Sequence, residues 1–277
     1  MPVKINYTKK NSGNFSSNSV LFTDEKINLN NLKKHISNNE FNYINDLQKN
    51  IDLKKNIFVY EVNSKRNIIL IPIKNNIKIS DIENLGAEFF GRVNYGKNNE
   101  YFINADSVSS KNINFLGHFL HGLKLKSYEF KKYKTKKETR IININITGNK
   151  NKSLISNQNK FKALEEGTFY ARDLVSEPGN ILHPDEYAKR LKLLKKDGLK
   201  VNVYDKKQLK KLGMNALLGV GKGSSKGSYL VTMEWNGAKN KSRPLAFVGK
   251  GVTFDTGGYS LKPARFMEDM TYDMAGS

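Results

Sequence analysis

The chain of 277 residues contains no cysteine. This absence excludes disulfide bridges, cysteine-ligated zinc or iron–sulfur sites and a thiol nucleophile, and it indicates a reducing compartment. Any metal ion would need nitrogen and oxygen ligands. The chain also lacks an apolar run of about 18 residues, and its polar N-terminus has no apolar signal region. We therefore expect a soluble, cytoplasmic protein that does not enter a membrane.

Acidic residues are scarce relative to basic ones. The 47 Lys and Arg residues exceed the 26 Asp and Glu residues by 21 charges, and residues 1–160 hold 27 of the basic and 13 of the acidic ones. Such an excess can indicate a nucleic-acid partner. The same region is rich in Asn and Ile and poor in Arg, which is typical of drift in an A/T-rich genome. We expect nucleic acid to bind only non-specifically.

The length is sufficient for two domains, and we place them at residues 1–155 and 156–277. The polar stretch 148–158 has no periodicity and is typical of a linker. Residues 1–17 are expected to fray or to form an edge segment. The apolar pattern then predicts a hairpin over 57–73, helices over 81–90 and 115–130, with Ser80 capping the first, and a half-buried strand over 140–147.

The second domain alternates helical and strand-like patterns. Helices are predicted at 161–174, 185–196 and 206–212, and strands at 201–204, 216–220, 229–235 and 245–248. Near-continuous apolar strands between helices favour a sheet covered on both faces. The predicted fold is an N-terminal α/β domain, followed by the first part of a mostly parallel, helix-flanked sheet domain.

The segment Gly249–Ser277 holds the residues best suited to chemistry. It follows a predicted buried strand, and ligands in open α/β sheets bind beyond the carboxyl ends of the strands. Lys250, Asp255, Lys262 and Asp273 lie there among glycines that let the backbone come close. These side chains suit a cation site. They are also compatible with an ordinary loop that carries two ion pairs, and spacing alone favours that interpretation.

Three other patterns are weaker. The glycine-rich stretch 219–227 matches no phosphate-binding signature and is interpreted as a turn. His118 and His121 lie three residues apart on a predicted helix without a metal-site motif, so a packed or solvated pair is expected. The basic run 124–137 alternates Lys with Tyr, as nucleic-acid surfaces do.

Several ordered motifs together resemble one family. VGKGVTFDTGGYSLKP (248–263), the following Met267, Met270 and Asp273, ARDLVSEPGNILHPDEYA (171–188) and GMNALLGVGKGS (213–224) are similar to the M17 leucine aminopeptidases, the cytosol aminopeptidases that use two metal ions. The resemblance covers residues 115–277.

The resemblance implies a role for each candidate residue. Lys250, Asp255 and Asp273 would be metal ligands for two divalent ions, Mn²⁺ or Zn²⁺, with Asp255 between them. A lysine can bind a metal only as the neutral amine. Lys262 would be catalytic, contacting the substrate and the developing oxyanion. Met270 would face the first side chain of the substrate, although a simple core methionine is an equal alternative.

The implied activity is removal of leucine-type residues from the N-termini of peptides by a homo-hexamer. In this family a second half of the catalytic domain adds an Asp-x-Glu metal-binding pair and an Arg that holds bicarbonate, and the sequence reaches Ser277 before either. We therefore expect this chain to be an incomplete and inactive portion of the enzyme. The alternative, from another class, is a basic nucleic-acid-binding protein on the same fold.

Overall fold

The computed structural model describes residues 2–8, 18–49, 55–108, 114–136, 140–148, 158–238 and 243–277. The chain divides into two compact units, 1–169 and 170–277, and each is described by itself. The domain boundary expected at 155/156 lies outside the described residues, as does most of the predicted linker, and it stays a prediction. No helix within the described ranges is long and apolar enough to cross a bilayer.

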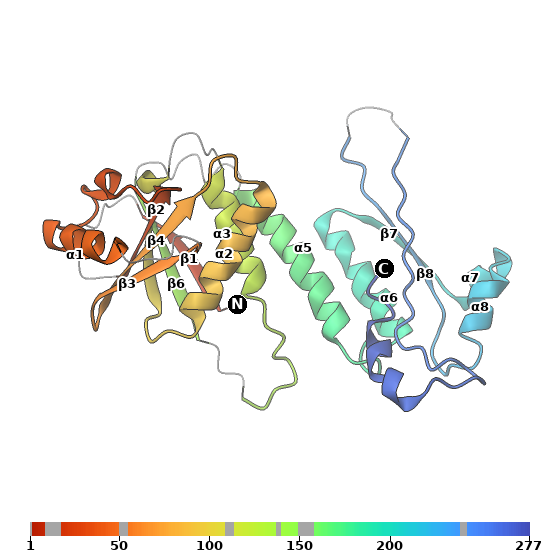
Figure 1. Ribbon diagram of the computed structural model, residues 1–277. Coiled ribbons are helices and arrows are strands. Elements are labelled where there is room, and N and C mark those ends of the chain that lie inside the picture. Colours follow the sequence, from red (N-terminus) through yellow and green to blue (C-terminus); the bar gives the residue numbers. More distant parts are fainter. Residues whose placement is uncertain are drawn as a thin grey trace. The chain divides into compact units, whose positions relative to one another are not determined.

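A six-stranded, mostly parallel sheet organises the first unit (Figure 1). Its order is β1-β6-β5-β2-β4-β3, and only the β3–β4 hairpin is antiparallel. The strands are β1 (Val3–Tyr7), β2 (Asn18–Asp24), β3 (Phe58–Asn63), β4 (Arg66–Ile73), β5 (Glu100–Asn104) and β6 (Ile142–Thr147). The α/β fold, the hairpin and the edge position of the first segment are confirmed. Residues 9–17 of that segment lie outside the described ones.

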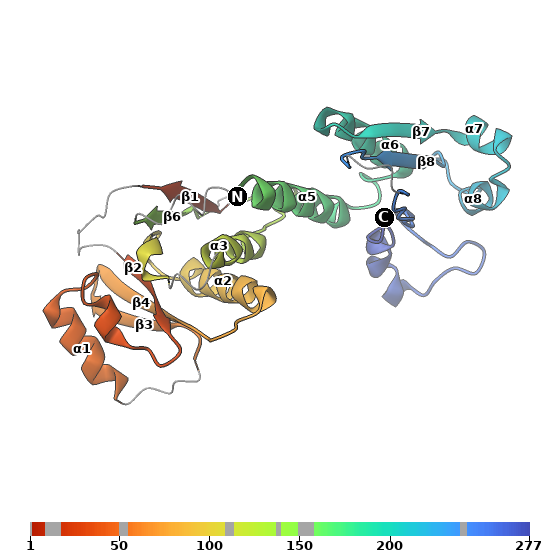
Figure 2. The ribbon, with the colours of Figure 1, turned by 90° about the horizontal axis from the view of Figure 1, so that it is seen from above.

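Both faces of this sheet are buried. Along β4, Ile69 and Ile71 point into one apolar cluster, while Ile68 and Leu70 point into the other, as the two-residue period of a strand requires. The first cluster includes side chains of α2 (Ile79–Asn94) and α3 (Phe115–Lys126). The second includes side chains of α1 (Asn38–Gln48) and η1 (Leu29–Leu32), which lie on the opposite side (Figure 2). A short turn, η2 (Ala105–Ser107), follows β5.

Three sequence predictions for this unit need correction. The strand over 140–147 is buried on both faces, since Asn145 is 8% exposed and bonds Asn6 and Glu100 across the sheet. The helix predicted over 115–130 ends at Lys126, because Ser127 bonds the carbonyl of Lys124 through both its backbone N–H and its hydroxyl. The helix predicted over 81–90 begins at Ile79 with Lys78 at its N-cap, so Ser80 lies inside the first turn and does not cap the helix.

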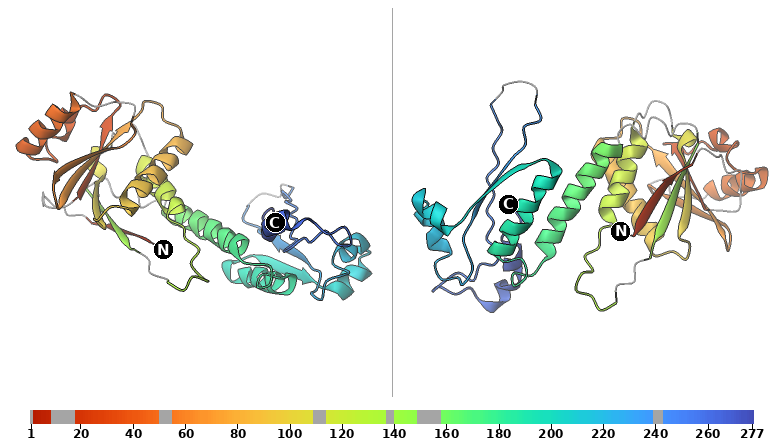
Figure 3. Two further views of the ribbon diagram at one scale, coloured as in Figure 1. Left: turned by 60° about the horizontal axis from the view of Figure 1, so that its bottom comes forward. Right: turned by 180° about the vertical axis from the view of Figure 1, so that it is seen from behind.

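The second unit contains a small antiparallel sheet of β7 (Lys200–Tyr204) and β8 (Leu230–Glu234), with α6 (Pro184–Leu193) beside it (Figure 3). α5 (Gln158–Ser176) leads into this unit, and η3 (Leu194–Asp197), α7 (Lys206–Lys211), η4 (Ala264–Phe266) and η5 (Glu268–Tyr272) complete it with α8. The predicted helices and the strands at 201–204 and 229–235 are confirmed.

The strand predicted at 216–220 is wrong, because these residues form the helix α8 (Asn215–Val220). Gly213, at φ +72°, ends α7, and the amide of Leu218 then bonds the carbonyl of Met214. Ala216, Leu217 and Leu218 are good helix formers, and a run of five apolar residues has no periodicity to distinguish the two structures.

The strand predicted at 245–248 is also absent among the described residues. Leu245, Phe247 and Val248 are 80%, 89% and 99% exposed, and no described strand pairs with them. An apolar run forms a buried strand only where neighbouring strands supply hydrogen bonds, and among the described residues of this unit only β7 and β8 pair.

The helices α2 and α3 approach each other through two glycines. A Cβ atom on Gly86 would lie 1.9 Å from the carbonyl oxygen of Phe119, and one on Gly122 would lie 1.9 Å from that of Glu83. Only hydrogen atoms fit in these gaps, so the glycines fix the distance between the two helices.

We predict that Gly122→Ala destabilises the first unit by about 1–3 kcal/mol or more, because the added methyl forces the helices apart. Gly167→Ala is the matched control. No atom lies within 4 Å of the added methyl at that helical position, so it should stabilise by about 0.5–1 kcal/mol. Urea unfolding followed by circular dichroism measures both changes. Equal effects of the two variants would contradict the close-packing account.

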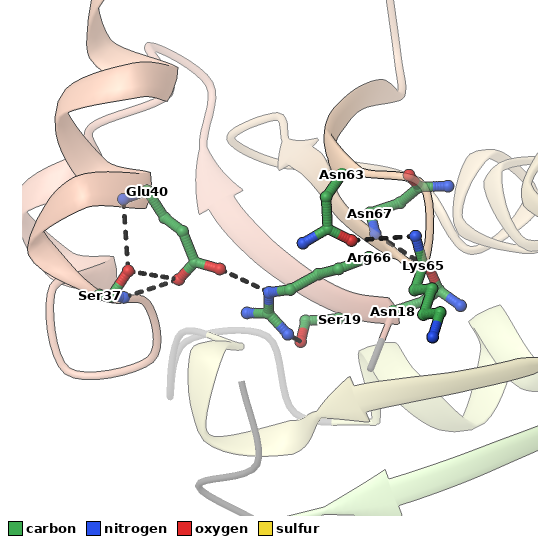
Figure 4. Close-up of polar contacts among 8 residues, drawn as sticks. All are labelled: Asn18, Ser19, Ser37, Glu40, Asn63, Lys65, Arg66 and Asn67. Atoms are coloured by element: carbon green, nitrogen blue, oxygen red, sulfur yellow. Dashed lines mark hydrogen bonds and ion pairs between the residues drawn. The ribbon is translucent and has the colours of Figure 1, made fainter. Parts of the chain in front are cut away.

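A buried ion pair joins α1 to the sheet (Figure 4). Arg66 Nε donates to Glu40 Oε1 at 2.5 Å, and both side chains are less than 10% exposed. Ser37 begins α1 with a capping box, in which its hydroxyl accepts from the amide of Glu40 while Glu40 Oε2 accepts from the amide of Ser37. Burial opposes ionisation of Glu40, but the bonds from Arg66 and Ser37 outweigh it and lower the pKa of that carboxyl.

We predict that Glu40→Gln destabilises the first unit by about 3 kcal/mol at neutral pH, because the buried guanidinium of Arg66 then loses the ionised carboxylate that faces it. Since the pKa of Glu40 is lower in the folded state, its contribution is present above the unfolded pKa of about 4.3 and is lost as the pH falls through the folded value. Denaturation measured from pH 7 to pH 3 should therefore show a smaller acid-dependent loss in Glu40→Gln. If the wild-type protein and Glu40→Gln lose the same stability in acid, Glu40 is not the source of that loss.

Candidate functional site

The candidate residues lie in a segment that turns and short 3₁₀ helices hold together. Asp255 Oδ1 accepts from the amide of Gly257 at 2.9 Å, and the amide of Lys262 donates to the carbonyl of Thr256 at 3.0 Å. Gly257 adopts φ +93°, and a Cβ there would lie 2.5 Å from the carbonyl oxygen of Ser260. Only glycine permits this turn. The turn brings Lys262 back to Asp255.

The first group of candidates consists of Asp255, Lys262 and Met270. Lys262 Nζ lies 2.8 Å from Asp255 Oδ2 and 3.0 Å from Met270 Sδ. Met270 belongs to η5, and its side chain is half-buried rather than enclosed in a core. The ammonium of Lys262 therefore has one charged and one soft partner, both at the accessible surface of the unit.

The second group consists of Lys250 and Asp273. Lys250 Nζ pairs with Asp273 Oδ2 and also donates to the backbone carbonyl of Asp273 at 3.0 Å. Asp273 is the less exposed partner, with 23% of its side chain accessible against 57% for Lys250. Each acidic candidate is thus matched with a lysine.

The two groups share one electrostatic environment. The hydrogen bond from Lys262 lowers the pKa of Asp255 most, followed by the bond from the Gly257 amide, and the charges of Lys262 and Lys250 act in the same direction. Asp255 is ionised at neutral pH. The loop with two ion pairs, one of the two sequence interpretations, describes this arrangement, and no three His, Asp or Glu side chains in the described ranges gather as metal ligands.

Sequence reasoning missed the residues that hold this segment and the turn before β8 against α6. The hydroxyl of Tyr187 lies 2.8 Å from Ser277 Oγ. Asp185 Oδ1 accepts from the hydroxyl of Tyr229 at 2.7 Å and from the amide of Gly227 at 3.1 Å. Tyr187 and Asp185 belong to the motif ARDLVSEPGNILHPDEYA, but only the tertiary contacts show what they do.

The weaker motifs serve structural purposes. His118 Nδ1 lies 2.9 Å from Glu83 Oε1, His121 Nδ1 lies 3.1 Å from Glu165 Oε1, and both rings pack on Phe161. The expected packed pair is confirmed. The glycine-rich stretch 219–227 is the end of α8 and a turn, as expected.

We predict that Lys262→Met raises the pKa of Asp255 toward its ordinary range, because Lys262 is the largest cause of the lowered value. Carbon-13 NMR of the labelled Asp255 carboxyl during an acid titration measures it. Lys226→Met is the matched control, since this basic side chain lies in the same unit and does not act on Asp255. A pKa of Asp255 unchanged in Lys262→Met would contradict the pairing.

Comparison with known proteins connects this segment to one family. Residues 169–277 match the family described as "Cytosol aminopeptidase family, catalytic domain". A protein of Wolbachia pipientis wMel named "Probable cytosol aminopeptidase" is 50% identical over 163 residues, which are 57% of this chain and 33% of that protein. A protein of the same name from Phytoplasma australiense is 45% identical over 65% of this chain and 37% of its own length. The chain thus spans about one third of these relatives.

Solved structures agree on the fold. A mutant of tomato leucine aminopeptidase superposes with a TM-score of 0.71 at 18% identity, covering 99% of this chain and 57% of that one. The bottromycin maturation enzyme BotP in complex with Mn gives 0.67 at 19% identity, covering 94% and 53%. At these identities the likeness concerns the fold alone. Residues 169–277, which contain every candidate site residue, are thus similar to the catalytic domain of the cytosol aminopeptidase (M17) family.

Proposed function

We propose that this chain supplies the first part of the catalytic domain of a divalent-metal-dependent aminopeptidase, which removes leucine-type residues from the N-termini of peptides. The observation that carries the proposal is the convergence of Lys250, Asp255, Lys262 and Asp273 within the residues that match the family. The names of the relatives and of the tomato enzyme support the reaction class.

The candidate ligands fit a divalent ion in kind. Asp273 Oδ2 is buried and faces the amine of Lys250, so one cation already occupies the place where a metal ion would be held. Asp255 offers a second hard oxygen whose lowered pKa keeps it ionised. Lys250, Asp255 and Asp273 would hold the ion, with the Lys250 amine deprotonated on binding. The Mn named with BotP is consistent with this ligand set.

The ligands do not suffice in number for two ions. The described residues bring two carboxylates and two amines to the site and no group of three acidic or histidine side chains. Two divalent ions need several more oxygen or nitrogen ligands than this. We therefore also propose that the 277-residue chain alone does not hydrolyse peptides. The second ion, bicarbonate and a homo-hexamer would require residues beyond this set.

Two side chains would act on the substrate. When bound, a divalent ion polarises the scissile carbonyl and favours ionisation of water. Lys262, held 2.8 Å from Asp255 and charged, would donate a hydrogen bond to the oxygen on which negative charge develops. Met270, half-buried beside Lys262, offers a deformable apolar contact for the first side chain of a peptide.

The test compares the 277-residue chain with a chimera in which the remaining length is taken from the Wolbachia relative. We expect the chimera to hydrolyse a leucyl anilide in Mn²⁺ and to lose activity with a chelator, while the 277-residue chain is inactive. Comparable turnover by the two would contradict the proposed division of the site. A folded chimera that neither retains Mn²⁺ nor hydrolyses the anilide would contradict the proposed function.

Substitutions in the chimera test the ligand assignment. Asp255→Asn should lose more metal and activity than Asp273→Asn, because Asp255 would contact both ions. Its loss of turnover should exceed the roughly 10- to 100-fold typical of residues that only orient ligands. Asp269→Asn, an exposed carboxylate of η5, is the matched control and should retain both. Elemental analysis gives the metal content, and two equivalents retained in Asp255→Asn would remove this residue from the site.

A further inference from the structure

Tyr187 touches both segments that carry the Lys250–Asp273 pair. It lies on α6, is 8% exposed, and packs in the core cluster of the second unit with Leu174, Leu182 and Met274. The segment that ends at Ser277 lies beside this helix (Figure 1). None of these contacts involves a candidate ligand directly.

The hydroxyl of Tyr187 takes part in a directed hydrogen-bond chain. Ser277 Oγ lies 2.7 Å from the carbonyl oxygen of Met274, which can only accept, so the serine hydroxyl donates there. Tyr187 must then be the donor in its own 2.8 Å contact with Ser277 Oγ. The amide of Ser277 also bonds the carbonyl of Met274 at 3.0 Å. This chain fixes the turn that directly follows Asp273.

The ring of Tyr187 lies next to the other segment. Its Cε1 atom lies 3.5 Å from the position of a Cβ on Gly251, the residue that follows Lys250. A Cβ on Gly249 would lie 2.4 Å from the Cα of Ser277, so the backbone just before Lys250 lies against that of Ser277. A single side chain thus bonds Ser277, packs with Met274, the neighbour of Asp273, and lies next to Gly251, the neighbour of Lys250.

We infer that Tyr187 is a positioning residue, which holds Lys250 against Asp273 through its hydroxyl on the Met274–Ser277 turn and its ring on Gly251. The inference rests on the proposed function in one respect: the Lys250–Asp273 pair matters because both residues are candidate metal ligands of the proposed enzyme. The pair itself is measurable without metal or substrate.

The experiment measures the reactivity of Lys250 in the 277-residue chain. A lysine amine held against a carboxylate is shielded from an acetylating reagent, and brief acetylation with quantitative mass spectrometry reports each lysine separately. Tyr187→Phe keeps the ring and removes the hydroxyl. We expect acetylation of Lys250 to become about two- to tenfold faster, the range set by the net contribution of one hydrogen bond. Ser277→Ala should give the same increase, and the double variant should add little to either.

Two controls separate positioning from general loosening. Tyr170 packs against the same core cluster, and its buried hydroxyl has no hydrogen-bond partner, so Tyr170→Phe should leave Lys250 unchanged. Lys200, paired with Glu234 at 3.0 Å in the β7–β8 sheet, is the internal reference whose rate should stay constant. Thermal unfolding of each variant is measured in parallel.

The outcomes decide the inference independently of the proposed function. The inference is supported if acetylation of Lys250 becomes faster in Tyr187→Phe and in Ser277→Ala but not in Tyr170→Phe, while the rate at Lys200 stays constant. An unchanged Lys250 rate, or an equal rise at Lys200, overturns it. Equilibrium dialysis of the wild-type chain against Mn²⁺ is a separate measurement. If no Mn²⁺ binds, the proposed metal ligands are contradicted. The conclusion about Tyr187 still depends only on the acetylation rates.

Discussion

The matching of each acidic candidate with a lysine is the interaction on which the candidate site depends. Asp255 and Asp273 lie in a segment with few regular hydrogen bonds, and two ionised carboxylates sharing one environment would repel each other. Lys262 and Lys250 compensate these charges. The same pairing sets a condition for metal binding. If Asp273 holds a divalent ion as proposed, that ion would take the place of the Lys250 ammonium, and a lysine that then became a ligand would release its proton. Metal uptake by such a site would increase with pH.

The two units reach stability in different ways. In the first unit, both faces of the parallel strands are covered, so the strands need apolar side chains on both faces. Successive residues of β4 accordingly point into opposite apolar clusters. Gly86 and Gly122 then allow α2 and α3 to lie against each other at backbone distance. In the second unit, the small antiparallel sheet buries little, and specific contacts from α6 order the segments around it. The candidate site belongs to the part of the chain that depends on individual hydrogen bonds.

This difference explains what could be predicted from the sequence. The hairpin at 57–73 and the long helices have a clear two- or 3.6-residue period, and the structure confirms them. The short apolar runs at 216–220 and 245–248 have no period, and their structure depends on neighbours that the sequence does not reveal. Asn145 was expected at a polar face, but bonds to Asn6 and Glu100 make its burial possible. For the site, the motifs identified the residues, while the pairing of Lys250 with Asp273 and the position of Tyr187 required the tertiary structure.

The upstream motif has a physical role although it contains no candidate ligand. His183 and Pro184 start α6, with the ring of His183 accepting from the amide of Glu186. Arg190 fixes the helix further along, through Glu186 at 2.9 Å and the buried Glu177 at 3.0 Å. On this fixed helix, Asp185 bonds the turn that leads into β8, and Tyr187, two residues later, contacts the segments next to Lys250 and Asp273. A rigid helix can fix the position of two loops relative to each other, whereas the loops alone cannot. On the inference drawn above, α6 positions the segments next to the Lys250–Asp273 pair, some 60 residues before the first candidate ligand.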